Sequence, residues 1–177
     1  QQYASEELKR EYLPRFASGE VMGAMDLTEP QAGSDLGGIV TRATEEDGRY
    51  FVDGDKIFIT NGGAEVHLVL ARDDDHFEES KGSTKGLSLF ICPRTKRDGS
   101  PNGVTVERLE HKMGIKASPT CVMDMEDATG YLVGTPHKGM RSMFVMMNAA
   151  RLHVGCEGIA LGEIAYQTAL AFAKDRR

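Results

Sequence analysis

The stretch Met25-Asp-Leu-Thr-Glu-Pro-Gln-Ala-Gly-Ser-Asp35 is short, polar and rich in turn formers, and runs typical of β-strands flank it. Thr28 and Ser34 supply hydroxyl groups, Pro30 fixes a turn, and Gly33 can adopt a positive φ or let a ligand approach the backbone closely. So many small donors and acceptors in one structured loop suit a polar or anionic ligand. The residues alone leave a second interpretation open, which is a tight surface connection without a ligand.

Composition and charge exclude several classes of protein. The 177 residues are 40% hydrophobic and 27% charged, which is ordinary for a globular domain with one sizeable core. The net charge of −6 argues against nucleic acid as the main partner, because phosphate binding needs a basic face. No apolar run has the length of a membrane span and no secretory signal is recognisable, so we expect a cytoplasmic protein without a membrane span.

Cysteine and histidine residues follow no metal-binding pattern. The three cysteines, Cys92, Cys121 and Cys156, lie far apart, and we expect them to be reduced and mostly buried. The histidines are also scattered: His67, His76, His111, His137 and His153. The sequence therefore predicts no metal site.

Strand patterns dominate residues 20–126. The strongest is Arg49–Thr60, where two β-rich runs flank Asp53-Gly54, the dipeptide preferred in two-residue hairpins, so a hairpin turn is predicted there. The other predicted strands are 21–27, 39–44, 66–71, 87–92, 104–109 and 121–125. The acidic and polar span 72–85 is predicted to be a solvated loop. Short strands with frequent turns favour a mainly-β domain, either a barrel or a sandwich.

Helical spacing marks both ends of the chain. Residues 5–16 carry apolar side chains at helical intervals; Pro14 is expected to disturb the last turn, and Ser18-Gly19 to end the helix. From Gly139 onward apolar residues again recur at helical intervals, which predicts a long helix or a broken pair. Since both ends of the chain lie inside or beside helical patterns, we expect a fragment of a longer protein.

Four motifs, in this order, resemble the acyl-CoA dehydrogenase family. They are Leu27-Thr-Glu-Pro-Gln-Ala-Gly-Ser-Asp35, Lys56-Ile-Phe-Ile-Thr60-Asn-Gly62, Lys112-Met-Gly114, and Arg151 early in the last helical segment. The runs 111–123, 128–134 and 146–155 are similar to the long bacterial branch that includes the 3-methylmercaptopropionyl-CoA dehydrogenases. The resemblance implies a mainly-β fold, a middle-domain-like β-barrel flanked by an N-terminal helix end and a long C-terminal helix.

The resemblance also implies a domain division. Residues 1–18 would be the end of an N-terminal helical domain, 19–135 the central β-barrel domain, and 136–177 the first helix of a truncated C-terminal helical domain. In this family FAD is the cofactor, and a Glu removes the α proton of an acyl-CoA while the β hydride passes to the flavin. The expected function is therefore the α,β-dehydrogenation of an acyl-CoA thioester in fatty acid metabolism.

Site residues are carried over only where this chain matches the family motifs. The implied FAD-binding residues are Met25, Leu27, Thr28, Gly33, Ser34, Phe58, Ile59, Thr60 and Arg176. The implied substrate contacts are Ser34, Asn148 and Arg151, with Arg151 supporting catalysis. Phe58 replaces a Trp that usually packs against the flavin, so stacking is expected to survive while an indole N–H donor is lost.

Without the resemblance these residues have ordinary interpretations. Phe58 and Thr60 would be strand residues, one buried and one exposed, and Arg151 would be an exposed helix residue. Ala150 occupies the position where some branches carry the catalytic Glu, so the base is expected on a later helix beyond Arg177. The isolated chain is therefore expected to be inactive and to hold FAD poorly.

Partners and alternatives follow from the same resemblance. We expect an acyl-CoA substrate, electron-transfer flavoprotein as the electron acceptor, and a homo-oligomer in the full-length protein. Three alternatives stay open: an acyl-CoA oxidase, a flavin-binding relative that has lost dehydrogenation and acts in stress protection, and a β-barrel interaction module without flavin. The rest of the chain and the acceptor used would distinguish them.

Overall fold

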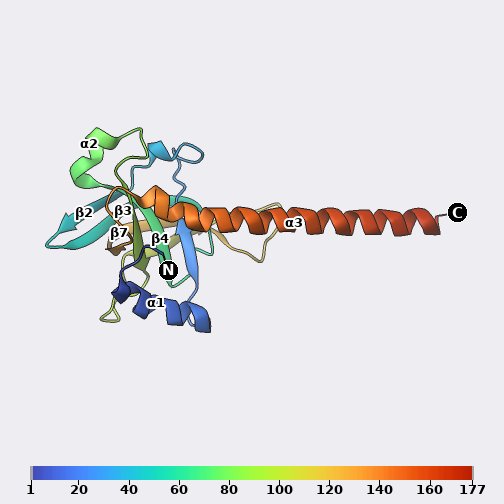
Figure 1. Cartoon of the computed structure of the whole chain (residues 1–177), viewed down its shortest axis with the longest axis horizontal. Helices are drawn as coiled ribbons and strands as arrows, with labels where there is room; N and C mark the ends of the chain where they lie inside the picture. The colour runs from blue at the N-terminus through green and yellow to red at the C-terminus, as the bar shows by residue number, and fades with distance from the viewer. Residues whose placement is uncertain (1, 177) are drawn as a thin grey trace. The chain divides into compact units, whose positions relative to one another are not determined.

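The computed structural model describes residues 2–176, which separate into one unit that ends at Ser142 and a second that begins at Met143. The elements are α1 (Glu6–Ser18), β1 (Gly23–Asp26), η1 (Leu36–Gly38), β2 (Arg42–Glu46), β3 (Arg49–Thr60), β4 (Val66–Asp73), η2 (Asp74–His76), α2 (Phe77–Ser80), β5 (Leu87–Pro93), β6 (Val104–Leu109), β7 (Thr120–Leu132) and α3 (Gly139–Asp175). In Figure 1, α1 and α2 lie on opposite sides of the strands. The predicted three-part domain division stays a prediction.

Five strands of the first unit close into a barrel. Their hydrogen-bonded order is β4–β2–β3–β7–β5, and the ring closes because β5 also pairs with β4, from Val66↔Pro93 to Arg72↔Leu87. β1 lies parallel to β4, and β6 pairs with β7. Closure leaves no open edge in the ring. The mainly-β barrel with an N-terminal helix and a long C-terminal helix is confirmed, and the sandwich alternative is wrong.

The barrel interior is filled by inward-pointing apolar side chains at alternate strand positions. On β7 these are Cys121, Met123 and Met125, and on β5 they include Phe90, whose ring packs 5.0 Å from that of Tyr50. Both described cysteines of the barrel are buried and free, as expected, whereas Cys156 of the second unit is exposed. The core therefore gives β3 and β7 a rigid support.

The predicted hairpin at Asp53-Gly54 is wrong. β3 runs without interruption through this dipeptide, and the turn that joins β2 to β3 is the earlier Asp47-Gly48, with φ of 50° and 75°. A register shift between Val52 and Gly54 makes a bulge instead, with φ of 142° at Gly54. The Asp53 carboxylate accepts a hydrogen bond from a β7 backbone N–H at 2.7 Å, so its role is to hold two strands together.

Two other local predictions need correction. α1 continues through Pro14 to Ser18, because a helix can lose one backbone hydrogen bond and still be held by its buried face; Gly19 then ends it with φ of 76°. The span 72–85 is not a plain solvated loop: it holds η2 and α2, and it begins with Arg72, which is fully buried.

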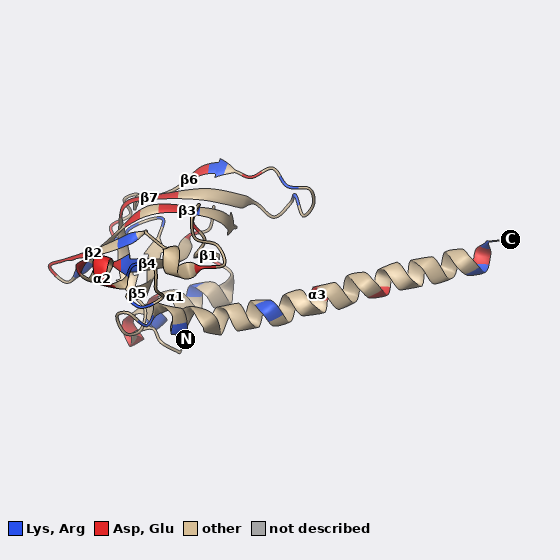
Figure 2. Cartoon of the chain, turned by 90° about the horizontal axis from the view of Figure 1, so that it is seen from above, with Lys and Arg blue, Asp and Glu red and all other residues tan. Residues whose placement is uncertain are grey.

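α3 is a single helix rather than a broken pair, and Figure 1 draws it without a break. Figure 2 shows that charged residues are sparse along it. Exposed apolar residues lie along its length: Leu152, Val154, Ile159, Leu161, Ile164, Tyr166 and Phe172. None of the helices in the described part of the chain combines the length and the apolarity that crossing a bilayer requires.

Candidate functional site

The loop after β1 is folded into a turn and docked on β3. Glu29 and Ala32 exchange two backbone hydrogen bonds, of 3.0 and 3.1 Å, which close the turn around Pro30. The carbonyl of Thr28 accepts a hydrogen bond of 2.8 Å from the backbone N–H of Ile57 on β3. Residues of the first and second sequence motifs are thus direct neighbours.

A buried ion pair anchors this loop. Lys56 Nζ lies 2.7 Å from Glu29 Oε1, and the two side chains are 0% and 1% exposed. The ammonium also donates to the carbonyls of Leu70 at 2.7 Å and Leu27 at 3.2 Å, so each of its protons has an acceptor. The same carboxylate accepts hydrogen bonds from the Thr41 hydroxyl, at 2.5 Å, and from a backbone N–H.

Burial and charge oppose one another in this pair. Desolvation works against ionisation of Glu29, but the charge of Lys56 and the hydrogen bonds to the carboxylate outweigh it and hold the pKa of Glu29 below its ordinary value. Desolvation lowers the pKa of Lys56, and Glu29 partly restores it. We infer an ionised pair whose geometry ties Leu27–Glu29 to β3 and β4.

A second bulge turns two side chains of β3 outward. The register with β7 shifts between Lys56 and Ile59, and Phe58 adopts a φ of 58°, which is unusual for a bulky residue. Phe58 is 61% exposed and Thr60 is also exposed, whereas the side chain of Ile59 lies in the core. The ordinary expectation that one of Phe58 and Thr60 is buried is therefore wrong. Any ligand contact by Ile59 must come from its backbone.

The remaining loop residues are at least partly exposed, and two of them have backbone N–H groups without an acceptor among the described residues. Met25 is 37% exposed, Leu27 and Thr28 are half-buried, and Gly33 and Ser34 are exposed. Among the hydrogen bonds between described residues, none uses the backbone N–H of Thr28 or Ser34. Open amide donors beside an exposed aromatic ring fit a planar group with polar edges, such as the isoalloxazine ring of FAD.

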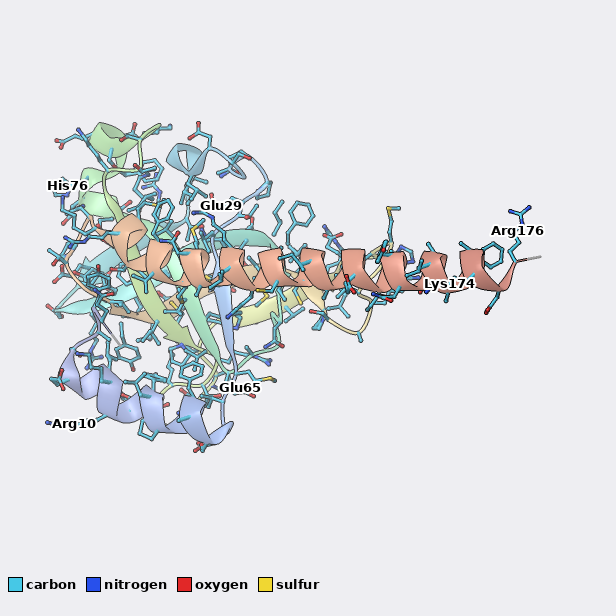
Figure 3. The ribbon with its side chains drawn as sticks, turned by 45° about the vertical axis from the view of Figure 1, so that its right-hand side comes forward. Arg10, Glu29, Glu65, His76, Lys174 and Arg176 are labelled. Atoms are coloured by element: carbon cyan, nitrogen blue, oxygen red, sulfur yellow. The ribbon has the colours of Figure 1, made fainter. Side chains whose placement is uncertain are left out.

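The other predicted site residues belong to the second unit. Arg151 is exposed, donates to Asn148 Oδ1 at 3.2 Å, and its guanidinium lies 5.4 Å from the centroid of the Phe144 ring. Arg176 follows the last turn of α3, as Figure 3 shows, and its backbone N–H donates to the carbonyl of Phe172. Within this unit Arg151 and Asn148 form one polar pair.

Asp26 and His67 form a second buried polar pair, which the sequence did not predict. His67 Nδ1 lies 2.8 Å from Asp26 Oδ2, and His67 Nε2 lies 3.2 Å from the carbonyl of Ala64. Contacts of both ring nitrogens with oxygen atoms fix the orientation of the His67 ring. Asp26 Oδ1 has no partner among the described residues. No sequence signal joins the two residues, because the parallel pairing of β1 with β4 brings them together.

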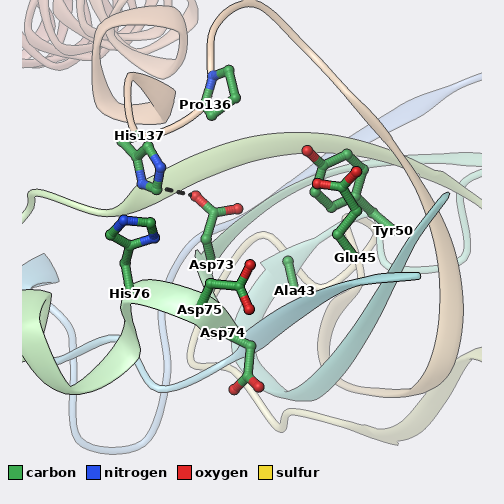
Figure 4. A pocket seen from close by; sticks show the side chains of 9 residues that line it. All are labelled: Ala43, Glu45, Tyr50, Asp73, Asp74, Asp75, His76, Pro136 and His137. Carbon is green, nitrogen blue, oxygen red and sulfur yellow. Dashed lines mark ion pairs between the residues drawn. The ribbon is translucent and has the colours of Figure 1, made fainter. Parts of the chain in front are cut away.

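The first unit also contains an acidic pocket with two histidines, of about 200 Å³. Figure 4 shows Asp73 directed at His137, whose Nδ1 lies 3.1 Å from the carboxylate, with the His76 ring edge-on beneath it. Burial raises the pKa of Asp73, and a hydrogen bond from Ser88 partly offsets this. The remaining lining residues are Ala43, Glu45, Tyr50, Asp74, Asp75 and Pro136. None of the predicted site residues lines this pocket, and no metal-binding group of three occurs in residues 2–176.

Comparison with known proteins matches the sequence of this chain to one family. The sequence model described as "Acyl-CoA dehydrogenase, middle domain" matches residues 24–128. The chain is 46% identical to the 3-methylmercaptopropionyl-CoA dehydrogenase of Ruegeria pomeroyi over 97% of this chain and 30% of that protein.

Solved structures agree in fold. The butyryl-CoA dehydrogenase of Megasphaera elsdenii matches 99% of this chain and 45% of its own, with 35% identity and a TM-score of 0.86. An acyl-CoA dehydrogenase of Bacillus anthracis, solved in complex with FAD, matches 99% of this chain and 29% of its own, with 33% identity and a TM-score of 0.83. The chain thus spans less than half the length of these relatives.

Proposed function

Because the chain belongs to the acyl-CoA dehydrogenase family, we propose that the whole protein is an FAD-dependent acyl-CoA dehydrogenase. One observation carries the proposal: the loop Leu27–Ser34 is docked on β3 beside the outward-facing Phe58 and Thr60. This arrangement lies within the residues that match the family's middle domain. The 46% identity to a 3-methylmercaptopropionyl-CoA dehydrogenase supports the same reaction class.

The first unit would hold the flavin ring through both chain segments. We propose that the amides of Thr28 and Ser34 donate to the polar edge of the ring, that Phe58 packs on its face, and that Thr60 donates from its hydroxyl. Bound FAD supplies the acceptor for a hydride. The Lys56–Glu29 pair keeps the loop in place, so these donors need no rearrangement.

The remaining FAD contacts are proposed from sequence alone. Met25, Leu27 and Gly33 would line the loop side, Ile59 would contribute its backbone, and Arg176 would contact the FAD of a neighbouring subunit in the homo-oligomer. Met25, Gly33 and Arg176 are exposed and Leu27 is half-buried, so a ligand can reach each of them. Ile59 is the exception, because its side chain is committed to the core.

The substrate would be an acyl-CoA thioester. Ser34 is exposed next to the proposed flavin loop, and Asn148 and Arg151 form a polar pair on α3. We propose that these groups orient the thioester so that its α and β carbons meet the flavin. We further propose a cytoplasmic homo-oligomer that passes electrons to electron-transfer flavoprotein.

Anaerobic mixing of the purified whole protein with acyl-CoAs tests the function. Butyryl-CoA and 3-methylmercaptopropionyl-CoA serve as probes, with loss of oxidised-flavin absorbance and formation of enoyl-CoA as readouts. We expect flavin reduction by at least one acyl-CoA and slow reoxidation by air. Absence of bound flavin, or a flavin that no acyl-CoA reduces, would contradict the proposal, and rapid peroxide release on admitting air would favour an oxidase.

A matched pair of variants links the reaction to the site. Thr60→Val removes the proposed hydroxyl donor and is expected to slow flavin reduction about tenfold or more. Thr105→Val, at an exposed position of β6, is expected to leave the rate unchanged. Equal rates in both variants would remove Thr60 from the proposed flavin contacts.

A further inference from the structure

Arg72, near the end of β4, is a buried cation without a carboxylate partner among the described residues. Its side chain is fully buried, and none of the described ion pairs includes it. Burial lowers the pKa of Arg72, and the charge of Glu29 partly restores it. A buried guanidinium is costly unless each of its donors has an acceptor.

Backbone carbonyls of two loops provide those acceptors. The guanidinium Nε and Nη2 donate to Ile39 and Gly37, at 3.1 and 3.0 Å, in the segment around η1. Nη2 also donates to Ser83, and Nη1 to the carbonyls of Ser80 and Lys85 and the Ser80 hydroxyl, at 2.7 to 2.9 Å. One side chain therefore holds residues 37–39 and residues 80–85 together. We call the two segments that contain these acceptors, residues 34–39 and 80–86, the paired loops.

The paired loops also touch directly. A Cβ added at Gly37 would lie 2.9 Å from the carbonyl oxygen of Gly82, so only glycine allows this approach. The Asp35 carboxylate accepts a hydrogen bond of 2.9 Å from the backbone N–H of Gly37, and Ser34 directly precedes it. The position of Ser34 thus depends on the contact that Arg72 maintains.

We propose that Arg72 is a positioning residue that sets the substrate side of the site by holding the Ser34 loop against residues 80–86. The inference rests on the proposed function, since it takes Ser34 as a contact of the acyl-CoA. The fork of Arg72 has five N–H donors, whereas Lys has three on a single nitrogen and cannot serve both loops at once. Replacement of the guanidinium group would let the paired loops separate while the strands of the barrel stay paired.

The test uses the whole FAD-loaded protein with Arg72→Lys. We expect the KM for acyl-CoA to rise about tenfold, because a misplaced contact weakens binding, while kcat stays within about twofold. FAD content should stay close to that of wild type, because Thr28, held by β3 and by the Lys56–Glu29 pair, keeps its proposed flavin contact even where the contact from Ser34 weakens. Amide hydrogen exchange should accelerate in residues 34–39 and 80–86 and stay unchanged in β3 and β7, because only the paired loops open.

A second variant disturbs the contact between the paired loops without altering Arg72. Gly37→Ala places a methyl group against Gly82 and should raise KM in the same way. One control should leave KM unchanged: Arg42→Lys changes only an exposed ion pair, with Asp74, on the neighbouring strand β2.

The outcomes separate this inference from the proposed function. An active protein whose KM and loop exchange are unchanged by both Arg72→Lys and Gly37→Ala overturns the role of Arg72 alone. The proposal is also overturned if Arg72→Lys lowers kcat, FAD content and the protection of core amides from hydrogen exchange together. That result would show that Arg72 only stabilises the fold. If the wild-type protein turns over no acyl-CoA, the proposed function and the substrate role of Arg72 fail together.

Discussion

Lys56 connects the barrel interior to the loop that contains Leu27 and Glu29. Its ammonium is fully buried and bonded to one carboxylate and two carbonyls. A buried ion pair gains little net stability, since desolvation offsets the attraction, but removal of one partner leaves an unpaired charge. The pair with Glu29 therefore acts on geometry: it fixes Thr28 and its neighbours over β3.

Glu29→Gln tests this at the residue scale. The substitution leaves Lys56 without a counter-charge, and we expect the free energy of unfolding at neutral pH to fall by about 3 kcal/mol. The folded-state pKa of Glu29 is lowered, so its contribution is present above the ordinary Glu pKa and is lost as the pH falls through the folded value. Urea unfolding over an acid pH series measures the effect.

The comparison with wild type isolates Glu29 from other carboxyl groups. Burial raises the pKa of Asp73, which gives an opposite slope that both proteins share. The difference between the two stabilities should therefore shrink on acidification. The exposed Glu6→Gln serves as control and should track wild type. A difference that is constant with pH would show that Glu29 is not ionised in the folded protein.

At the scale of elements, β3 does more than contribute to the barrel. Its bulge at Gly54 shifts the register with β7 next to Asp53, and after its second bulge, before Ile59, Phe58 and Thr60 are both exposed. Positive φ at Phe58 is a strained state, and the rigid pairing with β7 maintains it. The strand thus packs Ile59 into the core while Phe58 and Thr60, the proposed flavin contacts, stay exposed.

Two glycine substitutions test the two Asp-Gly dipeptides. Gly48→Ala, in the hairpin turn, meets no atom within 4 Å and should cost about 1 kcal/mol through its φ of 75° alone. Gly54→Ala adds a Cβ at 2.8 Å from Thr41 Oγ1 at a φ of 142°, and should cost about 2–4 kcal/mol. Thermal unfolding of both variants checks the order. Equal costs would contradict the bulge as a packed feature.

Local patterns located the strands but not their connections. Runs such as 66–71 and 104–109 are visible in the sequence because buried strands are apolar or alternate. Asp47-Gly48 and Asp53-Gly54 look alike locally, and only the long-range pairing with β7 decides which one turns. The second bulge at Phe58 has no local signal, since its positive φ is imposed by the register.

At the scale of the whole molecule, the closure of the barrel and the buried polar contacts could not be predicted from the sequence. The pairing of β5 with both β4 and β7 distinguishes a barrel from a sandwich, and strand patterns carry no register. Arg72 stands at the start of an acidic span, so its burial was not predicted. The Asp26–His67 pair also depends on strand pairing. The loop 25–35 and Lys56–Thr60 were selected as candidate site segments because their motifs resemble a family, and their contacts with FAD stay a prediction.

The site as proposed needs the whole protein. The loop and β3 belong to the first unit, whereas Asn148, Arg151 and Arg176 belong to the second. The relatives that match over nearly all of this chain are more than twice as long, since it covers 29–45% of them. Binding and turnover are therefore properties to be measured on the whole protein.

The most direct measurement is an experimental structure of the whole protein with FAD. We predict the isoalloxazine ring against the Phe58 side chain, with the Thr28 amide and the Thr60 hydroxyl within hydrogen-bonding distance of its polar edge. The Lys56–Glu29 pair should remain intact beneath the loop. A flavin bound elsewhere, with the loop Leu27–Ser34 free of it, would contradict the account.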